Sequence, residues 1–135
     1  MSTGTGYATQ VALDMFPEAN GTACDLSMSM LSEARASLAR TLLICCDSAH
    51  LPFANGAFDL VLLQNAPPPL KELARVTAHR GWVVLGFSAA GRLPAWLPEQ
   101  IVRRLGKYGF RSARWRRAGR GMYIVGQIDV REDAA

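Results

Sequence analysis

Four continuous apolar runs, separated by segments of helical periodicity, constrain the fold of this chain more than any other feature. The runs lie at residues 21–26, 41–46, 59–64 and 82–87. Apolar runs without polar alternation are typical of strands that are covered on both faces, as in a parallel sheet. The segments around them repeat apolar residues at the spacing of a helix. The sequence therefore predicts an α/β fold in which ligands bind at the carboxyl ends of the strands.

Local signals place the remaining elements and their boundaries. Helices are predicted over 8–16, 27–38, 70–77 and 98–108, with Ser27 as an N-cap and Gly81 as a C′ residue after the third helix. Two alternating runs, 110–117 and 121–128, predict a terminal antiparallel hairpin. With roughly 100–200 residues per domain, we expect one domain over residues 1–128 and a disordered tail over 129–135.

Composition excludes several classes of protein. Half of the residues are apolar and 19% are charged, which does not fit an intrinsically disordered chain. No uncharged stretch approaches the roughly 20 apolar residues of a membrane span, and the start lacks the basic residues of a signal peptide. A cytoplasmic location without membrane contact is expected. The three cysteines Cys24, Cys45 and Cys46 have no metal-ligand spacing, so we expect reduced thiols and no metal site.

Charge is distributed unevenly along the chain. Residues 1–70 carry 2 basic and 6 acidic groups (net −4), whereas residues 71–135 carry 13 basic and 5 acidic groups (net +8). The basic residues of this half form either a surface that binds nucleic acid or a solvated surface made of a helix face and the polar side of a hairpin. The aromatic residues do not form a known RNA-reading motif, which favours the solvated surface, and a nucleic-acid partner is not expected.

Three features in chain order point to an adenosine-containing ligand. The loop Gly4-Thr5-Gly6 opens a helix and lets a ligand approach the backbone. Asp25 ends the next strand, 19 residues after Gly6, where a carboxylate can accept both hydroxyl hydrogens of a ribose. Asp47 ends the following strand, where it can read an adenine edge. Either aspartate alone could be a helix cap or turn former, but their order and spacing favour a nucleoside site.

These motifs give the chain a family resemblance. It resembles class I S-adenosylmethionine-dependent methyltransferases, in particular the methyltransferase type 11 branch related to quinone-biosynthesis C-methyltransferases. The segments that carry the resemblance are Gly4–Thr9, Asp25–Arg35, Asp47–Phe53, Phe58–Val61 and Glu72–Val76. The resemblance implies a Rossmann-like methyltransferase sheet, mostly parallel with a C-terminal antiparallel hairpin. It also implies S-adenosylmethionine as cofactor, a small-molecule methyl acceptor and no metal.

The resemblance also implies roles for individual residues. Gly4 and Gly6 would line the methionine moiety, with Thr5 in the same cofactor-binding loop. Asp25 would hold the ribose and Leu26 would pack on the adenine. The edge of the adenine would be contacted by Asp47 together with Ser48. Asn65, which follows the next strand, would face the methionine end and the acceptor.

One departure from the family concerns the beginning of the sheet. In the family a hydrophobic central strand with an acidic residue and a further glycine precedes the glycine loop, whereas here Met1-Ser2-Thr3 precede Gly4. We therefore expect an N-terminally truncated sheet, with strand edges that close up, borrow a strand or pair in a homodimer. Two functions stay open. They are methyl transfer, and a non-catalytic remnant or regulatory subunit that binds S-adenosylmethionine weakly or not at all.

No catalytic residue is assigned from the sequence. Methyl transfer from a sulfonium is an in-line displacement on an already activated carbon, so proximity and desolvation can supply much of the acceleration. His50 could act as a base, but an exposed loop histidine is the favoured interpretation. A nucleotide-linked dehydrogenase would share the glycine loop and ribose carboxylate. Its dinucleotide site needs a second mononucleotide half, for which 135 residues leave little room.

Overall fold

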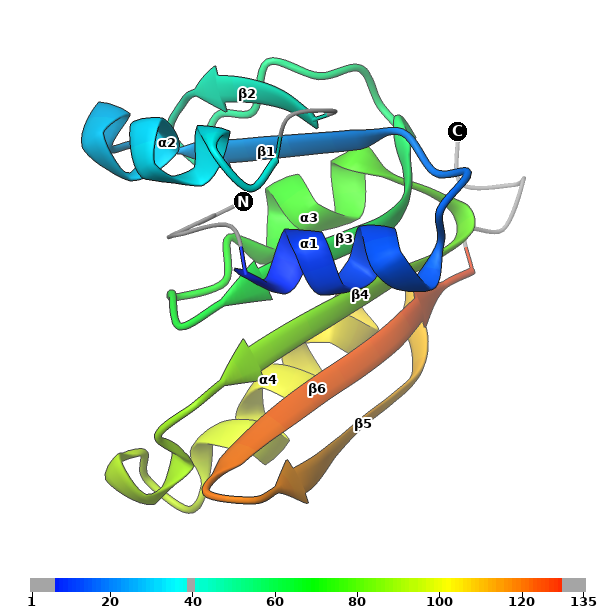
Figure 1. Ribbon diagram of the computed structural model, residues 1–135. Helices are drawn as coiled ribbons and strands as arrows, with labels where there is room; N and C mark the ends of the chain where they lie inside the picture. The colour runs from blue at the N-terminus through cyan, green and yellow to red at the C-terminus, as the bar shows by residue number, and fades with distance from the viewer. Residues whose placement is uncertain (1–6, 39–40, 130–135) are drawn as a thin grey trace. The chain divides into compact units, whose positions relative to one another are not determined.

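The computed structural model describes residues 7–38 and 41–129 (Figure 1). The chain divides into two compact units, Met1–Pro52 and Phe53–Ala135, and each unit has its own sheet. Two strand pairings are parallel and two are antiparallel, with helices between the strands. The expected α/β class is confirmed. No helix in the described part of the chain has the length and apolar character that a membrane crossing requires.

The first unit alternates helices and strands. Its elements are α1 (Tyr7–Met15), β1 (Gly21–Asp25), α2 (Met28–Arg35) and β2 (Thr41–Cys45). The two strands are parallel and pair from Gly21 with Thr41 to Asp25 with Cys45. Ser27 caps α2 as expected, because its side chain accepts a hydrogen bond from the Met30 amide at 3.3 Å. A small core holds the unit together: Ala23, Ala34 and Leu38, with Leu13 and Leu43 against them.

The second unit is built on a four-stranded sheet in the order β3-β4-β6-β5. Its elements are β3 (Phe58–Gln64), α3 (Leu70–Val76), β4 (Thr77–Phe87), the short 3-10 helix η1 (Ala90–Arg92), α4 (Leu97–Lys107), β5 (Phe110–Ala118) and β6 (Gly121–Ile128). The strands β3 and β4 are parallel, whereas β6 is antiparallel to both of its neighbours. The predicted terminal hairpin is therefore confirmed.

One face of this sheet forms the core of the second unit. Val61 pairs with Val83, and Leu63 pairs with Leu85, which also pairs with Ile124. All five side chains are buried. In Figure 1 the helix α4 lies behind β4 and β6, and it packs on β5 and β6 through its own buried apolar stripe. That stripe consists of Pro98, Ile101 and Leu105.

The boundary between α3 and β4 differs from the sequence prediction. The helix ends at Val76 and the chain enters β4 directly at Thr77, so the expected C′ role of Gly81 is wrong. Gly81 instead lies inside β4, where an added Cβ would be 2.8 Å from the Ala78 carbonyl oxygen. The ladder is irregular here, since pairing jumps from Phe58–Thr77 to Leu60–Trp82. Glycine is required by this close backbone approach in an irregular strand, and not by a helix end.

Neither β1 nor β3 has two hydrogen-bonded neighbours among the described residues. The strand β1 pairs with β2 alone, and β3 pairs with β4 alone. Each therefore has one edge without a described ladder. Unpaired strand edges carry backbone groups that need water or another strand as partner.

Arg75 ties the loop before β3 to helix α3. Its guanidinium donates to the Glu72 carboxylate, with Nε–Oε1 at 2.7 Å and Nη2–Oε2 at 2.9 Å. Nη1 also donates to the Phe53 carbonyl at 2.6 Å and to Asn55 Oδ1 at 3.1 Å. The hydrogen bond with Glu72 raises the pKa of Arg75 above its ordinary value. The planar guanidinium can donate to Glu72, Phe53 and Asn55 at the same time, whereas the ammonium group of a lysine cannot match this arrangement of donors.

Replacing Arg75 by lysine should therefore lower the thermal unfolding midpoint by about 2–5 °C, because the paired geometry is lost while the charge stays. Arg103→Lys, the same chemical change at an exposed position of α4, is the matched control and should leave the midpoint unchanged. Circular dichroism melting curves of both variants measure the difference. Equal midpoints for the two variants would contradict the role given to Arg75.

Candidate functional site

Asp25 stands at the carboxyl end of β1, as expected. Its Oδ1 atom accepts a hydrogen bond from the Ser27 amide at 3.0 Å, which fixes the carboxylate at the turn into α2. The Asp25 side chain is half-buried. Leu26 follows it with 73% of its surface exposed, although leucine is an apolar residue. A carboxylate and an open apolar surface are thus adjacent at one strand end.

The structure brings Asp47 to the same end of the sheet. The Cys46 amide donates to the Asp25 carbonyl at 3.1 Å and so continues the ladder one residue beyond β2. Asp47 is exposed, and its Oδ1 accepts from the Ala49 amide at 3.0 Å. Ser48, beside it, is half-buried. The two predicted nucleoside-binding carboxylates therefore belong to residues at the carboxyl end of one parallel strand pair.

His50 lies on the surface of the loop that follows. Its Nδ1 atom is 3.7 Å from Asp47 Oδ2, and its side chain is 87% exposed. An ion pair so open to water contributes little to stability. The favoured interpretation of His50, an exposed loop histidine, agrees with this position.

Asn65 lies in the second unit, at the carboxyl end of β3. Its amide donates to the Gly86 carbonyl at 2.8 Å, and its φ angle of 54° is in the left-handed region, which asparagine tolerates better than most residues. Asn65 Oδ1 accepts from the Ser88 amide at 2.8 Å and from the Ser88 hydroxyl at 3.2 Å. Ser88 was not predicted. It directly follows β4, so the rule that site residues lie at the carboxyl ends of strands could have found it.

The glycine loop Gly4-Thr5-Gly6 lies outside the described residues. The helix expected to follow it is confirmed as α1, which begins at Tyr7. Within residues 7–38 and 41–129, no group of three histidine, cysteine or acidic side chains could hold a metal ion.

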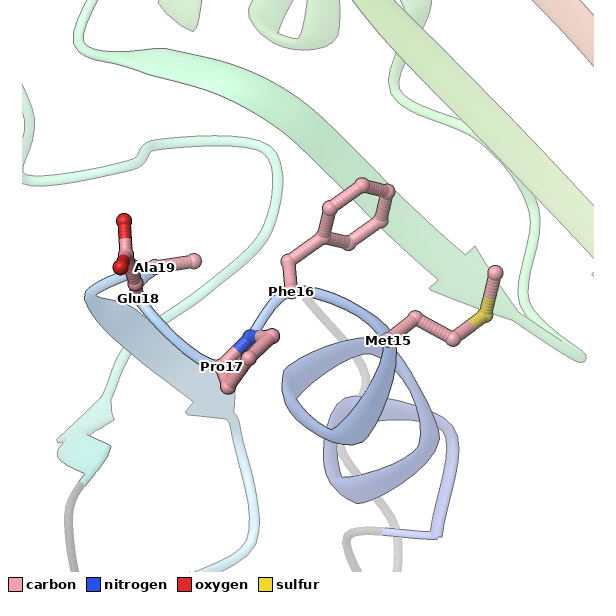
Figure 2. Close-up of a pocket in the computed structure, with 5 residues that line it drawn as sticks. All are labelled: Met15, Phe16, Pro17, Glu18 and Ala19. Carbon is pink, nitrogen blue, oxygen red and sulfur yellow. The ribbon is translucent and has the colours of Figure 1, made fainter.

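A surface hollow of about 440 Å³ lies where α1 ends (Figure 2). It is lined by Met15, Phe16, Pro17, Glu18 and Ala19. Met15 and Phe16 are 69% and 52% exposed, and Glu18 is the single charged residue of the lining. The hollow precedes the amino end of β1, away from the strand end that carries Asp25. A ligand site in an α/β sheet needs convergent polar groups at the carboxyl ends, so this hollow is not the candidate site.

Three arginines of the basic half of the chain lie on one face of β5. Arg111, Arg114 and Arg116 pair in register with Gln127, Val125 and Tyr123 of β6, so they share one face of the sheet. All three are exposed, and the Arg111 Nε atom is 3.4 Å from Asp129 Oδ2. Charged side chains on an edge strand oppose pairing with another strand. The solvated basic surface remains a prediction.

Comparison with known proteins gives two kinds of match. A family model described as "Methyltransferase domain" matches residues 1–81. A malonyl-[acyl-carrier protein] O-methyltransferase of Halorhodospira halophila is 35% identical over an alignment of 94 residues, and the match covers 62% of this chain and 32% of that protein. A demethylmenaquinone methyltransferase of Beutenbergia cavernae is 34% identical over an alignment of 95 residues, and the match covers 64% of this chain and 36% of that protein. The chain thus spans about a third of the length of these relatives.

Solved structures show the same fold. A chain of the complex between the Haloferax volcanii Trm112 methyltransferase activator and a methyltransferase matches this chain with a TM-score of 0.81 at 18% identity. The match covers 96% of this chain and 80% of that chain. Two further structural neighbours contain S-adenosylmethionine or S-adenosylhomocysteine. The expected Rossmann-like methyltransferase fold is confirmed.

Replacement of Asn65 tests the geometry at the end of β3. Asn65→Ala should lower the free energy of unfolding by about 1–2 kcal/mol, because alanine is disfavoured at positive φ and offers no acceptor to Ser88. Asn65→Gly also loses the acceptor but tolerates the backbone angle, so it should be the more stable of the two. Urea unfolding followed by tryptophan fluorescence reports on this unit, since Trp82, Trp96 and Trp115 all lie in it. An alanine variant as stable as the glycine variant would contradict the assignment.

Proposed function

Because the chain belongs to the methyltransferase domain family, we propose that it binds S-adenosylmethionine and supports methyl transfer to a small organic acceptor. The observation that carries the proposal is the placement of Asp25 and Asp47 at the carboxyl end of the parallel β1–β2 pair. Strand ends of this kind are where α/β folds bind nucleoside ligands.

The residues at this strand end fit the adenosine part of the cofactor chemically. Asp25 would accept hydrogen bonds from both ribose hydroxyls, because a carboxylate offers two acceptor oxygens. Leu26 would cover one face of the adenine with its exposed apolar side chain. Asp47 would accept from the exocyclic amine, and the Ser48 amide would donate to a ring nitrogen. The set matches the donors and acceptors of an adenosine.

The protein's contribution to the reaction is then positioning. S-adenosylmethionine, when bound, supplies an activated methyl carbon, so the chain itself need not provide a nucleophile. Asp25 and Asp47 would fix the adenosine and thereby orient the rest of the cofactor. An in-line displacement gains most from such orientation and from removal of water.

Asn65 is the residue that we propose to contact the acceptor. Its Oδ1 atom accepts hydrogen bonds from Ser88, and its Nδ2 group would donate to an oxygen of the methyl acceptor. The two curated relatives are named for a carrier-bound malonyl group and for demethylmenaquinone. Both a carboxylate and a quinone carry oxygen atoms that can accept a hydrogen bond from an amide N–H. An oxygen-bearing organic acceptor is therefore the class that we propose for this chain.

The role of Asp25 can be tested directly. Asp25→Ala should weaken binding of S-adenosylhomocysteine by about 1.5–3 kcal/mol, because a charge-assisted contact with the ribose is lost. Isothermal titration calorimetry on the 135-residue chain measures the affinity. Glu33→Ala removes an exposed carboxylate from α2 of the same unit and is the matched control, with no change expected.

Two results would contradict the proposal. One is an unaltered chain that binds no S-adenosylhomocysteine, and the other is an Asp25→Ala variant with unchanged affinity. Asp25→Asn keeps an acceptor for the Ser27 amide, so it separates loss of the ribose contact from a disturbed turn. Circular dichroism spectra establish that each variant is folded.

A further inference from the structure

Three thiols gather at the carboxyl ends of β1 and β2. Cys24 is the second-last residue of β1 and is 2% exposed. Cys45 ends β2 and is exposed, with its Sγ atom 3.4 Å from the Leu26 carbonyl oxygen. Cys46 follows immediately beyond the strand and is partly exposed. The methyl-transfer reaction uses none of them.

The strand register selects two of these thiols as neighbours. Cys24 pairs with Ile44, and Cys46 lies two residues beyond Ile44, so Cys24 and Cys46 belong to the same face of the sheet. Cys45 belongs to the opposite face. Consistent with this register, Cys24 and Cys46 are joined by a hydrogen bond between their side chains.

The two thiols differ in their surroundings. Burial, together with the hydrogen bond to Cys46, raises the pKa of Cys24 to about 12. Cys24 therefore stays protonated at neutral pH and is shielded from dissolved oxidants. Cys46 is the member of the pair that a small oxidant can reach, because it is partly exposed.

We propose that Cys24 and Cys46 form an oxidation-sensitive pair that hydrogen peroxide converts into an intrachain disulfide. The Cys46 thiolate attacks one peroxide oxygen, the O–O bond breaks, and the released hydroxide leaves as water after taking up a proton. Cys24 sulfur then attacks the Cys46 sulfenic acid, forming the S–S bond and breaking the S–O bond. The Cys24 proton leaves with the hydroxide as a second water. Two thiols are oxidised and one peroxide is reduced.

The chain can supply the movement that this bond requires. The sulfurs must approach from hydrogen-bond contact to the roughly 2.05 Å of a disulfide. Cys46 lies beyond the last residue of β2, where one ladder bond, from its amide to the Asp25 carbonyl, holds it. Motion at the end of a strand disturbs less of the ladder than motion within it.

The position of the pair connects it to the candidate site. Cys24 directly precedes Asp25, and Cys46 directly precedes Asp47. Drawing the two sulfurs together shifts both carboxylates from the arrangement of the reduced chain. The oxidised chain should then bind S-adenosylhomocysteine roughly tenfold more weakly, an effect that rests on the proposed function. Disulfide formation itself does not depend on that function.

Peptide mapping tests the disulfide. The 135-residue chain is treated with hydrogen peroxide, alkylated, digested with trypsin without reductant and analysed by mass spectrometry. The expected product joins the peptide of Cys24 to the peptide that contains both Cys45 and Cys46. It is lighter by two hydrogen atoms than the two peptides with Cys24 and Cys46 reduced and Cys45 alkylated, and it disappears with dithiothreitol. Cys45→Ser, the matched control from the opposite face, should keep this product, whereas Cys46→Ser and Cys24→Ala should lose it.

Several results would overturn the assignment. They are a product that persists in Cys46→Ser, a bond between the adjacent Cys45 and Cys46, a bond between two chains, and no disulfide at all. Calorimetry on the Cys45→Ser chain, oxidised and then reduced, tests the link to the site. A disulfide without loss of affinity for S-adenosylhomocysteine would refute that link. Failure of the reduced chain to bind would instead refute the proposed function.

Discussion

The parallel ladder between β1 and β2 is the interaction on which the candidate site depends. It places Asp25 opposite Cys45, and the bond from the Cys46 amide to the Asp25 carbonyl carries the pairing one residue further. Because parallel strands end on the same side, two carboxylates 22 positions apart in sequence reach one edge. The same register brings Cys24 and Cys46 together. One set of backbone bonds thus determines the placement of both the proposed nucleoside-binding residues and the thiol pair.

The fold was largely predictable because its strands are marked by local composition. Long apolar runs indicated β1 to β4, and the alternating runs indicated the hairpin of β5 and β6. Ser27 was recognised as a cap because its hydroxyl acts within one turn of its own helix. Gly81 was misassigned since a glycine after a helical pattern suggests a helix end. Its close contacts come from Thr77 and Ala78 of β4 itself and from the Asp59 carbonyl of β3, at an irregularity of the ladder that no local pattern reveals.

The candidate site was predictable in part for the same reason. The rule that ligands bind at the carboxyl ends of the strands identified Asp25, Asp47 and Asn65 without knowledge of tertiary contacts. Ser88 was missed because its partner Asn65 lies 23 residues away. Outside the site, the contacts of Arg75 with Phe53 and Asn55 span 22 and 20 residues and were missed for the same reason. The thiol pair was missed because adjacency across strands depends on register. A cysteine count cannot supply that information.

Residue-resolved titration tests the central claim most directly, namely that the ends of β1 and β2 hold the nucleoside of the cofactor. Amide chemical shifts of the 135-residue chain are followed by NMR as S-adenosylhomocysteine is added. The account predicts saturable shifts at residues 24–28 and 46–49, with residues 110–128 of the terminal hairpin unaffected. Shifts confined to the hairpin, or to the hollow lined by Met15 and Phe16, would contradict it.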